Sequence, residues 1–201
     1  ANTLTTAEHG GTHLDAPVHF AEGKRAVDEI PLDQLMGPGV IVDVTEACAA
    51  ERDHLVTREE LLAHEAVHGE IPEGAIVMLL TGFGRRWPDR TSYMGTETRG
   101  AEGVQQLHFP GLHPDAARWL AAERRIGAVG LDTPSIDHGP SLEFLSHRAL
   151  FEANVPALEN VANLHLLPPR GAESVALPMK IRRGSGAPVR IIAMLRAGPG
   201  R

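Results

Sequence analysis

Three short apolar segments, separated by stretches with helical patterns, constrain the fold of this chain most strongly. Residues 39–45 (GVIVDVT), 75–82 (AIVMLLTG) and 127–132 (GAVGLD) are apolar and end in turn-forming residues, as buried strands do. Three further short strands are expected near the C-terminus, in the segments VPALEN, SVALPMKI and PVRIIAML. Strands that alternate with helices indicate an α/β fold, here with α+β character, and the gathering of strands at the end favours mixed sheets over a purely parallel one.

Local signals predict three helices. Thr57 and Glu60 have the spacing of a capping box in front of REELLAHEAVH, and Gly69 is placed to end that helix. Pro114 can be the first residue of a helix over PDAARWLAAERR. Ser141 can cap a third helix that runs through LEFLSHRALFEA.

Composition excludes several classes of function. The 201 residues have a formal net charge of −7, so we expect no nucleic-acid partner, because such binding needs a basic surface. No apolar run approaches the roughly 20 residues that cross a bilayer, so we expect no membrane partner and a cytoplasmic location. The single cysteine, Cys48, excludes a cysteine-based zinc cluster. Any metal must therefore have nitrogen and oxygen ligands.

Four potential metal ligands are concentrated in the segment HGGTHLDAPVHF, residues 9–20. They are His9, His13, Asp15 and His19, in a chain with 11 histidines in all. The two glycines and the proline between them argue against a helix, so we expect loop geometry to bring the side chains together. Imidazole and carboxylate suit Zn²⁺ or Mn²⁺ without sharp discrimination. A solvated turn would explain any one of these histidines, but the set of four favours a metal site.

This segment resembles the His-x-Gly-Thr-His-x-Asp-x-Pro-x-His motif of the metal-dependent cyclase family, which includes bacterial kynurenine formamidases and isatin hydrolases. DTPSID at residues 132–137 and SHRALFEANVPALEN at residues 146–160 resemble later segments of that family, so the resemblance covers most of the chain. It implies one hydrolase domain over residues 1–201, of the swivelling β/β/α type. Family members have a few tens of residues before the motif, whereas eight precede His9 here, so we expect either that this sequence is incomplete at its N-terminus or that the usual N-terminal strands are absent.

The resemblance also implies roles for individual residues. The implied ligands of two Zn²⁺ ions, or of Mn²⁺, are His9, His13, Asp15, His147 and Glu159. Asp15 would bridge the two ions, which suits a carboxylate because it has two oxygens where a neutral imidazole has one lone pair. His19 would be the acid/base residue. Without the resemblance, His147 would be interpreted as a helix-surface residue paired with Glu143, and Glu159 as an exposed strand residue.

The implied reaction is hydrolysis of the C–N bond of a small linear or cyclic amide by metal-activated water, as in an arylformamidase. Family members tend to be dimers or larger, so we also expect a homo-oligomer, a dimer or tetramer. A long glycine-rich loop, GFGRRWPDRTSYMG, follows the strand at residues 75–82. Its Phe83, Trp87 and Tyr93 could stack on an aromatic substrate, and Arg85 or Arg86 could bind a carboxylate. A surface excursion with buried anchors is an equally open interpretation of this loop.

Two other functions compete with this interpretation. The sequence HEAVH matches the His-Glu-x-x-His pattern of zinc peptidases. In that pattern His64 and His68 would be the metal ligands and Glu65 the general base. The apolar arc of the same helix lies elsewhere, at Leu62, Ala63, Ala66 and Val67. We therefore expect the peptidase-like set to face water. The other competitor is a non-catalytic metal-binding module, which the presence of both His19 and Glu159 disfavours.

Overall fold

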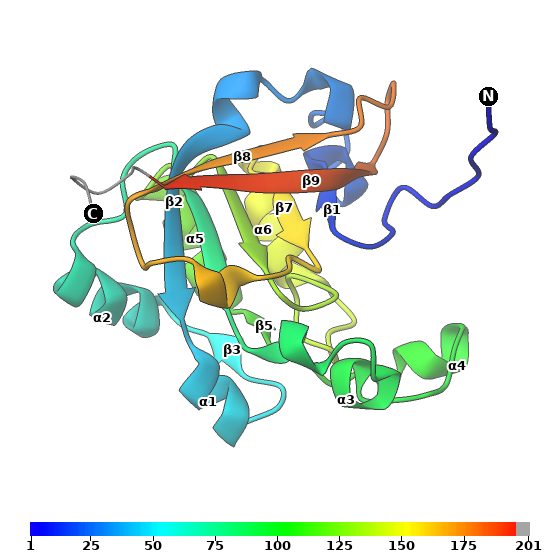
Figure 1. Ribbon diagram of the computed structural model, residues 1–201, viewed down its shortest axis with the longest axis horizontal. Helices are drawn as coiled ribbons and strands as arrows, with labels where there is room; N and C mark the ends of the chain where they lie inside the picture. The colour runs from blue at the N-terminus through cyan, green and yellow to red at the C-terminus, as the bar shows by residue number, and fades with distance from the viewer. Residues whose placement is uncertain (196–201) are drawn as a thin grey trace.

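The computed structural model describes residues 1–195 and has a closed β-barrel at its centre (Figure 1). Its strands follow one another in the order β1-β7-β6-β4-β2-β8-β9. Their bounds are β1 His13–Asp15, β2 Met36–Asp43, β4 Ile76–Leu80, β6 Ala128–Leu131, β7 Ala157–Glu159, β8 Ala172–Pro178 and β9 Gly186–Leu195. A separate two-stranded sheet consists of β3 (Leu55–Val56) and β5 (Gly111–Leu112).

Helices connect the strands and cover the barrel. The α-helices are α1 Thr45–Ala50, α2 Arg58–His68, α3 Arg90–Met94, α4 Ala101–Val104, α5 Pro114–Ala122 and α6 Leu145–Glu152. Short 3₁₀ turns are η1 Pro17–His19, η2 Val27–Glu29, η3 Leu32–Gln34, η4 Phe83–Arg86 and η5 Leu164–Leu166. Figure 1 shows α3 and α4 at one end of the molecule, extending away from the barrel. Within residues 1–195, no helix combines the length and the apolar character that a membrane crossing requires.

The barrel combines parallel and antiparallel pairing, which confirms the predicted mixed α/β class. β2, β4, β6 and β7 run parallel, whereas β1, β8 and β9 join their neighbours in antiparallel pairs. Every residue of β4 is buried, because this strand is covered on both faces. That explains its continuous apolar sequence, since a strand covered on one face only would alternate polar and apolar residues.

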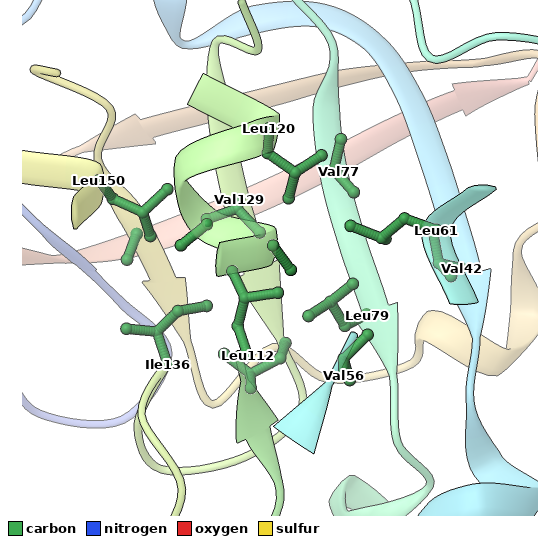
Figure 2. Close-up of a cluster of buried hydrophobic side chains, with 14 of the residues drawn as sticks. Val42, Val56, Leu61, Val77, Leu79, Leu112, Leu120, Val129, Ile136 and Leu150 are labelled. Atoms are coloured by element: carbon green, nitrogen blue, oxygen red, sulfur yellow. The ribbon is translucent and has the colours of Figure 1, made fainter. Parts of the chain in front are cut away.

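Two hydrophobic cores lie on the two faces of the sheet. Along β4, Val77 and Leu79 point into one core, and Ile76 and Met78 point into the other. This alternation follows from the two-residue period of a strand. Figure 2 shows the first core, where Val77 lies close to Leu61 of α2 and Leu120 of α5, while Leu150 of α6 lies at the opposite side of the core. The second core fills the interior of the barrel.

The helix ends test the capping predictions. The Thr57 hydroxyl accepts a hydrogen bond from the Glu60 backbone N–H, the Glu60 carboxylate accepts one from the Thr57 N–H, and Gly69 ends α2 with a φ of 90°. The predicted start of α5 at Pro114 is also confirmed. The helix ends at Ala122, however, earlier than the sequence pattern suggests.

The predicted start of α6 is wrong. Ser141 does not cap this helix, which begins at Leu145, after Phe144 turns the chain with a φ of 52°. The cap comes from Asp137, whose carboxylate accepts the backbone N–H groups of Ser146 at 3.0 Å and His147 at 3.1 Å. A carboxylate at this position satisfies donors that have no partner within the helix.

Candidate metal centre

Strand β1 presents two of the predicted ligands on one face. The expectation of a loop here is wrong, because residues 13–15 form a strand, so His13 and Asp15 point to one side and Leu14 points into the core. β1 runs antiparallel to β7 with His13 directly opposite Glu159. The His13 Nε2 atom lies 3.0 Å from Asp15 Oδ1 and 3.3 Å from Glu159 Oε2. Strand register therefore brings residues 13 and 159 to one point.

Helix α6 adds His147 to this cluster. Its Nε2 atom lies 3.1 Å from Glu159 Oε1 and 3.3 Å from Asp15 Oδ2. Its Nδ1 atom lies 2.6 Å from Asp137 Oδ2, so the carboxylate that caps the helix also orients the ring. Asp137 was not among the residues predicted for the site. Its position at the end of the DTPSID segment was the available signal.

The two remaining histidines lie at the outer side of the cluster. His9 Nδ1 is 2.6 Å from Asp15 Oδ1, and the ring of His19 stacks on that of His9 with centroids 4.2 Å apart. Ligand-type atoms of His9, Asp15 and His19 lie within 4.8 Å of one another. The structure thus brings together all six residues that the resemblance implied for the metal ligands and the acid/base role.

Close packing of acids and imidazoles shifts their ionisation. Burial alone would lower the pKa of His13, but hydrogen bonds to Asp15 and Glu159 raise it to about 10. Burial likewise opposes a rise at His147, yet the hydrogen bond to Asp137 and those to Asp15 and Glu159 raise the pKa of this ring well above its ordinary value. The three surrounding histidines lower the pKa of Asp15 even though burial alone would raise it. The site therefore favours positive charge between its carboxylates.

The donor set fits divalent cations. The Gly11 carbonyl accepts a hydrogen bond from His13 Nδ1 at 2.9 Å, and Asp137 accepts one from His147 Nδ1. Both rings, when neutral, thus present the lone pair of Nε2 toward carboxylate oxygens, which is unfavourable unless a cation lies between them. Two ligands about 2.0–2.1 Å from a tetrahedral ion are about 3.3 Å apart, close to the separations of 3.0–3.3 Å seen here.

A pocket of about 870 Å³ opens above this cluster, within the size range of small-molecule sites. Its walls include Trp87 and Tyr93, two of the residues suggested as substrate contacts, together with Phe20 and Phe144, which were not among them. The Tyr93 hydroxyl donates a hydrogen bond to Asn160 Oδ1 at 2.8 Å, and burial raises the pKa of this phenol.

Three residues suggested as substrate contacts, Phe83, Arg85 and Arg86, lie elsewhere. Phe83 is 1% exposed and belongs to the hydrophobic core, where Arg86 lies over its ring. Arg85 lines a different depression, beside Asp43. The arginine that does line the pocket is Arg90, from the start of α3.

Comparison with known proteins identifies the family. Residues 1–138 match the model of the cyclase family, described as "Putative cyclase". The chain is 33% identical over 202 residues to the isatin hydrolase of Roseibium aggregatum, covering 96% of this chain and 74% of that protein. It is 31% identical over 197 residues to the kynurenine formamidase of Salinibacter ruber, covering 98% of this chain and 80% of that protein. The chain belongs to the cyclase family.

Solved structures agree with this membership. The cyclase-family chain superposes with a TM-score of 0.86 on isatin hydrolase A from Labrenzia aggregata bound to benzyl benzoate, at 34% identity, covering 96% of this chain and 75% of the other. It superposes with a TM-score of 0.71 on a structure titled "potential metal-dependent hydrolase with cyclase activity", at 28% identity, covering 96% of this chain and 82% of the other. The predicted family and the predicted class, a hydrolase, are confirmed.

The peptidase-like motif of this cyclase-family chain has a structural role. Arg124 donates hydrogen bonds to both Glu65 oxygens, at 2.7 and 2.9 Å, and Glu65 also accepts one from the Ile71 N–H. The predicted orientation of α2 is wrong, because Glu65 packs inward while Val67, from the expected apolar arc, is 76% exposed. Arg124 explains the difference, since it gives an inward-facing carboxylate a partner. Glu65 is thus engaged in an ion pair, not free as a general base.

Proposed function

We propose that this chain hydrolyses the C–N bond of a small aryl amide, linear as in an N-formyl aryl amide or cyclic as in isatin, with two bound divalent cations, Zn²⁺ or Mn²⁺. The observation that carries the proposal is the convergence of ligand-type side chains from three distant segments at the floor of an apolar-walled pocket. These segments are residues 9–19, helix α6 and strand β7.

Asp15 is suited to join two cations. Its Oδ1 atom faces His9 and His13, at 2.6 and 3.0 Å, while its Oδ2 atom faces His147 at 3.3 Å. One ion would be held by the first two histidines and the other by His147 with Glu159. When bound, such ions lower the pKa of a coordinated water toward about 7 and polarise an amide carbonyl.

His19 supplies the proton transfers. Partial burial lowers the pKa of His19, which favours the neutral ring that can accept a proton. His19 lines the pocket beside His9. There it can accept a proton from the water molecule that attacks the amide carbon. The C–N bond then breaks, and His19 returns the proton to the departing nitrogen. The products are a carboxylate and an amine, joined in one molecule when the substrate is cyclic.

The pocket walls favour a flat, apolar substrate. Trp87, Phe20 and Phe144 present aromatic surface around the cluster. The two relatives are named for isatin and for kynurenine, which both contain an aromatic ring. The expected dimer or tetramer stays a prediction, which light scattering behind size exclusion would test.

Metal-stripped protein should be assayed with isatin and N-formylkynurenine, with and without added Zn²⁺ or Mn²⁺. We expect metal-dependent hydrolysis of at least one of them. His13→Ala should abolish both tight metal binding and turnover, while the matched control His64→Ala, on the exterior helix α2, should leave both unchanged. Loss of metal in the His64 variant alone, or no hydrolysis with any metal, would overturn the proposal.

A further inference from the structure

One of the two outer histidines of the cluster, His9, has a hydrogen-bond partner far along the chain, at Ser185. His9 points Nδ1 toward Asp15, and its other ring nitrogen, Nε2, lies 2.9 Å from the hydroxyl of Ser185. Ser185 in turn contacts Glu8, the residue next to His9. Its hydroxyl donates to Glu8 Oε2 at 2.7 Å, and its backbone N–H donates to the same atom at 2.9 Å.

The chemistry of these groups fixes the direction of the hydrogen bonds. A carboxylate only accepts, so the hydroxyl proton of Ser185 points to Glu8. The Ser185 oxygen then has lone pairs left and no second proton, so it accepts from His9 Nε2–H. A neutral imidazole with its proton on Nε2 has its lone pair on Nδ1, the atom that faces Asp15. The relay thus selects the tautomer that a metal ligand at Nδ1 requires.

The backbone holds this relay rigidly. The Ser185 carbonyl accepts the N–H of Ala16 at 2.8 Å, which ties the loop to the end of strand β1. Gly186 lies opposite Asp15 in the β1–β9 pairing. A Cβ at Gly186 would lie 2.5 Å from His9 Cε1 and 2.7 Å from the Leu14 carbonyl, so only glycine leaves room for the ring.

We propose that Glu8 and Ser185 are positioning residues that fix the tautomer and orientation of His9 as a metal ligand. The other two histidines assigned as metal ligands have partners of their own, a backbone carbonyl for His13 and Asp137 for His147. Outer partners of this kind orient ligands and affect metal affinity by about 10- to 100-fold. The proposal rests on the metal centre proposed above, and it adds two residues that orient its outer ligand, His9.

The test compares four variants of the full chain. Ser185→Ala removes the relay, and Ser185→Thr keeps the hydroxyl. Glu8→Gln supplies an amide N–H that can donate to the Ser185 oxygen, so the hydroxyl proton is no longer held toward residue 8 and can point to His9 instead. Glu173→Gln, at an exposed position on β8, matches the charge change of Glu8→Gln away from the site. Zn²⁺ affinity is measured by competition with a chromophoric chelator. The ¹⁵N chemical shifts of the His9 ring in the Zn²⁺-loaded protein report its tautomer, which a merely structural role would not change.

We expect Ser185→Ala to weaken Zn²⁺ binding by about 10- to 100-fold and to shift the His9 nitrogens, and Glu8→Gln to weaken binding by at least about threefold. Ser185→Thr and Glu173→Gln should bind within about threefold of the starting protein. Equal affinity and unchanged His9 shifts in Ser185→Ala, or equal losses in the Ala and Thr variants, would overturn the relay. If Ser185→Ala does not fold, unchanged binding by Glu8→Gln overturns it. Failure of the unaltered protein to bind Zn²⁺ would instead overturn the metal centre itself.

Discussion

Replacing Asp137 by Asn should destabilise the protein by about 3 kcal/mol. This carboxylate is 3% exposed and accepts three hydrogen bonds, two from the start of α6 and one from the ring of His147. Asparagine can still accept the Ser146 N–H, but its amide nitrogen cannot accept the two hydrogen bonds from His147. Losing the bond from the His147 backbone costs about 1 kcal/mol, and losing the buried bond between its ring and the charged carboxylate costs about 1.5–3 kcal/mol. In a domain of this size, the sum corresponds to a fall in Tm of about 6–12 °C.

A matched control lies on the surface. His108 Nδ1 and Asp53 Oδ2 are also 2.6 Å apart, but these side chains are 47% and 28% exposed, so Asp53→Asn should cost at most about 1 kcal/mol. Urea unfolding of both variants in EDTA measures the two free energies without any contribution from metal. If the two losses in free energy of unfolding agree within about 0.5 kcal/mol, the buried Asp137 stabilises the protein no more than a surface carboxylate does, and the reasoning is refuted.

Three further predictions concern other parts of the molecule. Glu65→Gln should cost about 1–2 kcal/mol at pH 7. Because the hydrogen bond from Arg124 lowers the pKa of Glu65, this contribution is present above the ordinary value of 4.5 and is lost as the pH falls, so the urea midpoints of variant and parent should converge below pH 4.5. Trp87→Ala should raise KM for aryl amides about tenfold and leave Zn²⁺ affinity unchanged, as steady-state kinetics and chelator competition would show; an unchanged KM would remove Trp87 from the substrate site. Leu120→Ala, in the core of Figure 2, should cost about 2–5 kcal/mol in urea unfolding, whereas Val67→Ala on the exposed face of α2 should change stability by less than about 0.5 kcal/mol; similar losses would contradict the assigned burial.

Features set by local contacts could be predicted from the sequence. The start of α2 depends on Thr57 and Glu60, three residues apart, and the start of α5 on Pro114, so both were predicted correctly. Strand β4 was predicted because its residues are all apolar, as expected of a strand that is covered on both faces. The concentration of His9, His13 and Asp15 in one segment indicated a metal site by itself. His147 and Glu159 came only from the resemblance to the cyclase family, since nothing local distinguishes them from exposed residues.

Features set by distant partners could not be predicted in this way. The start of α6 depends on Asp137, which lies nine and ten positions before the N–H groups that it accepts, whereas Ser141 was the nearer capping residue. The orientation of α2 depends on Arg124, which is 59 positions from Glu65. Strand β1 has only three residues, and its pairing with β9 has no sequence signal at either end. The rotation of a helix and the closure of a barrel are decided by such partners.

Closure of the barrel through β1 also links activity to the completion of folding. His13 pairs with Glu159 on one side and with Pro188 on the other, so the ring of strands closes at the residues that would hold the metal. These contacts join segments near both ends of the chain, and contacts of such long separation form slowly. A nascent chain still on the ribosome, without β7 and β9, would have the histidine-rich segment but not the neighbours that complete its coordination. The metal site would then be complete only once β7 and β9 have docked on β1.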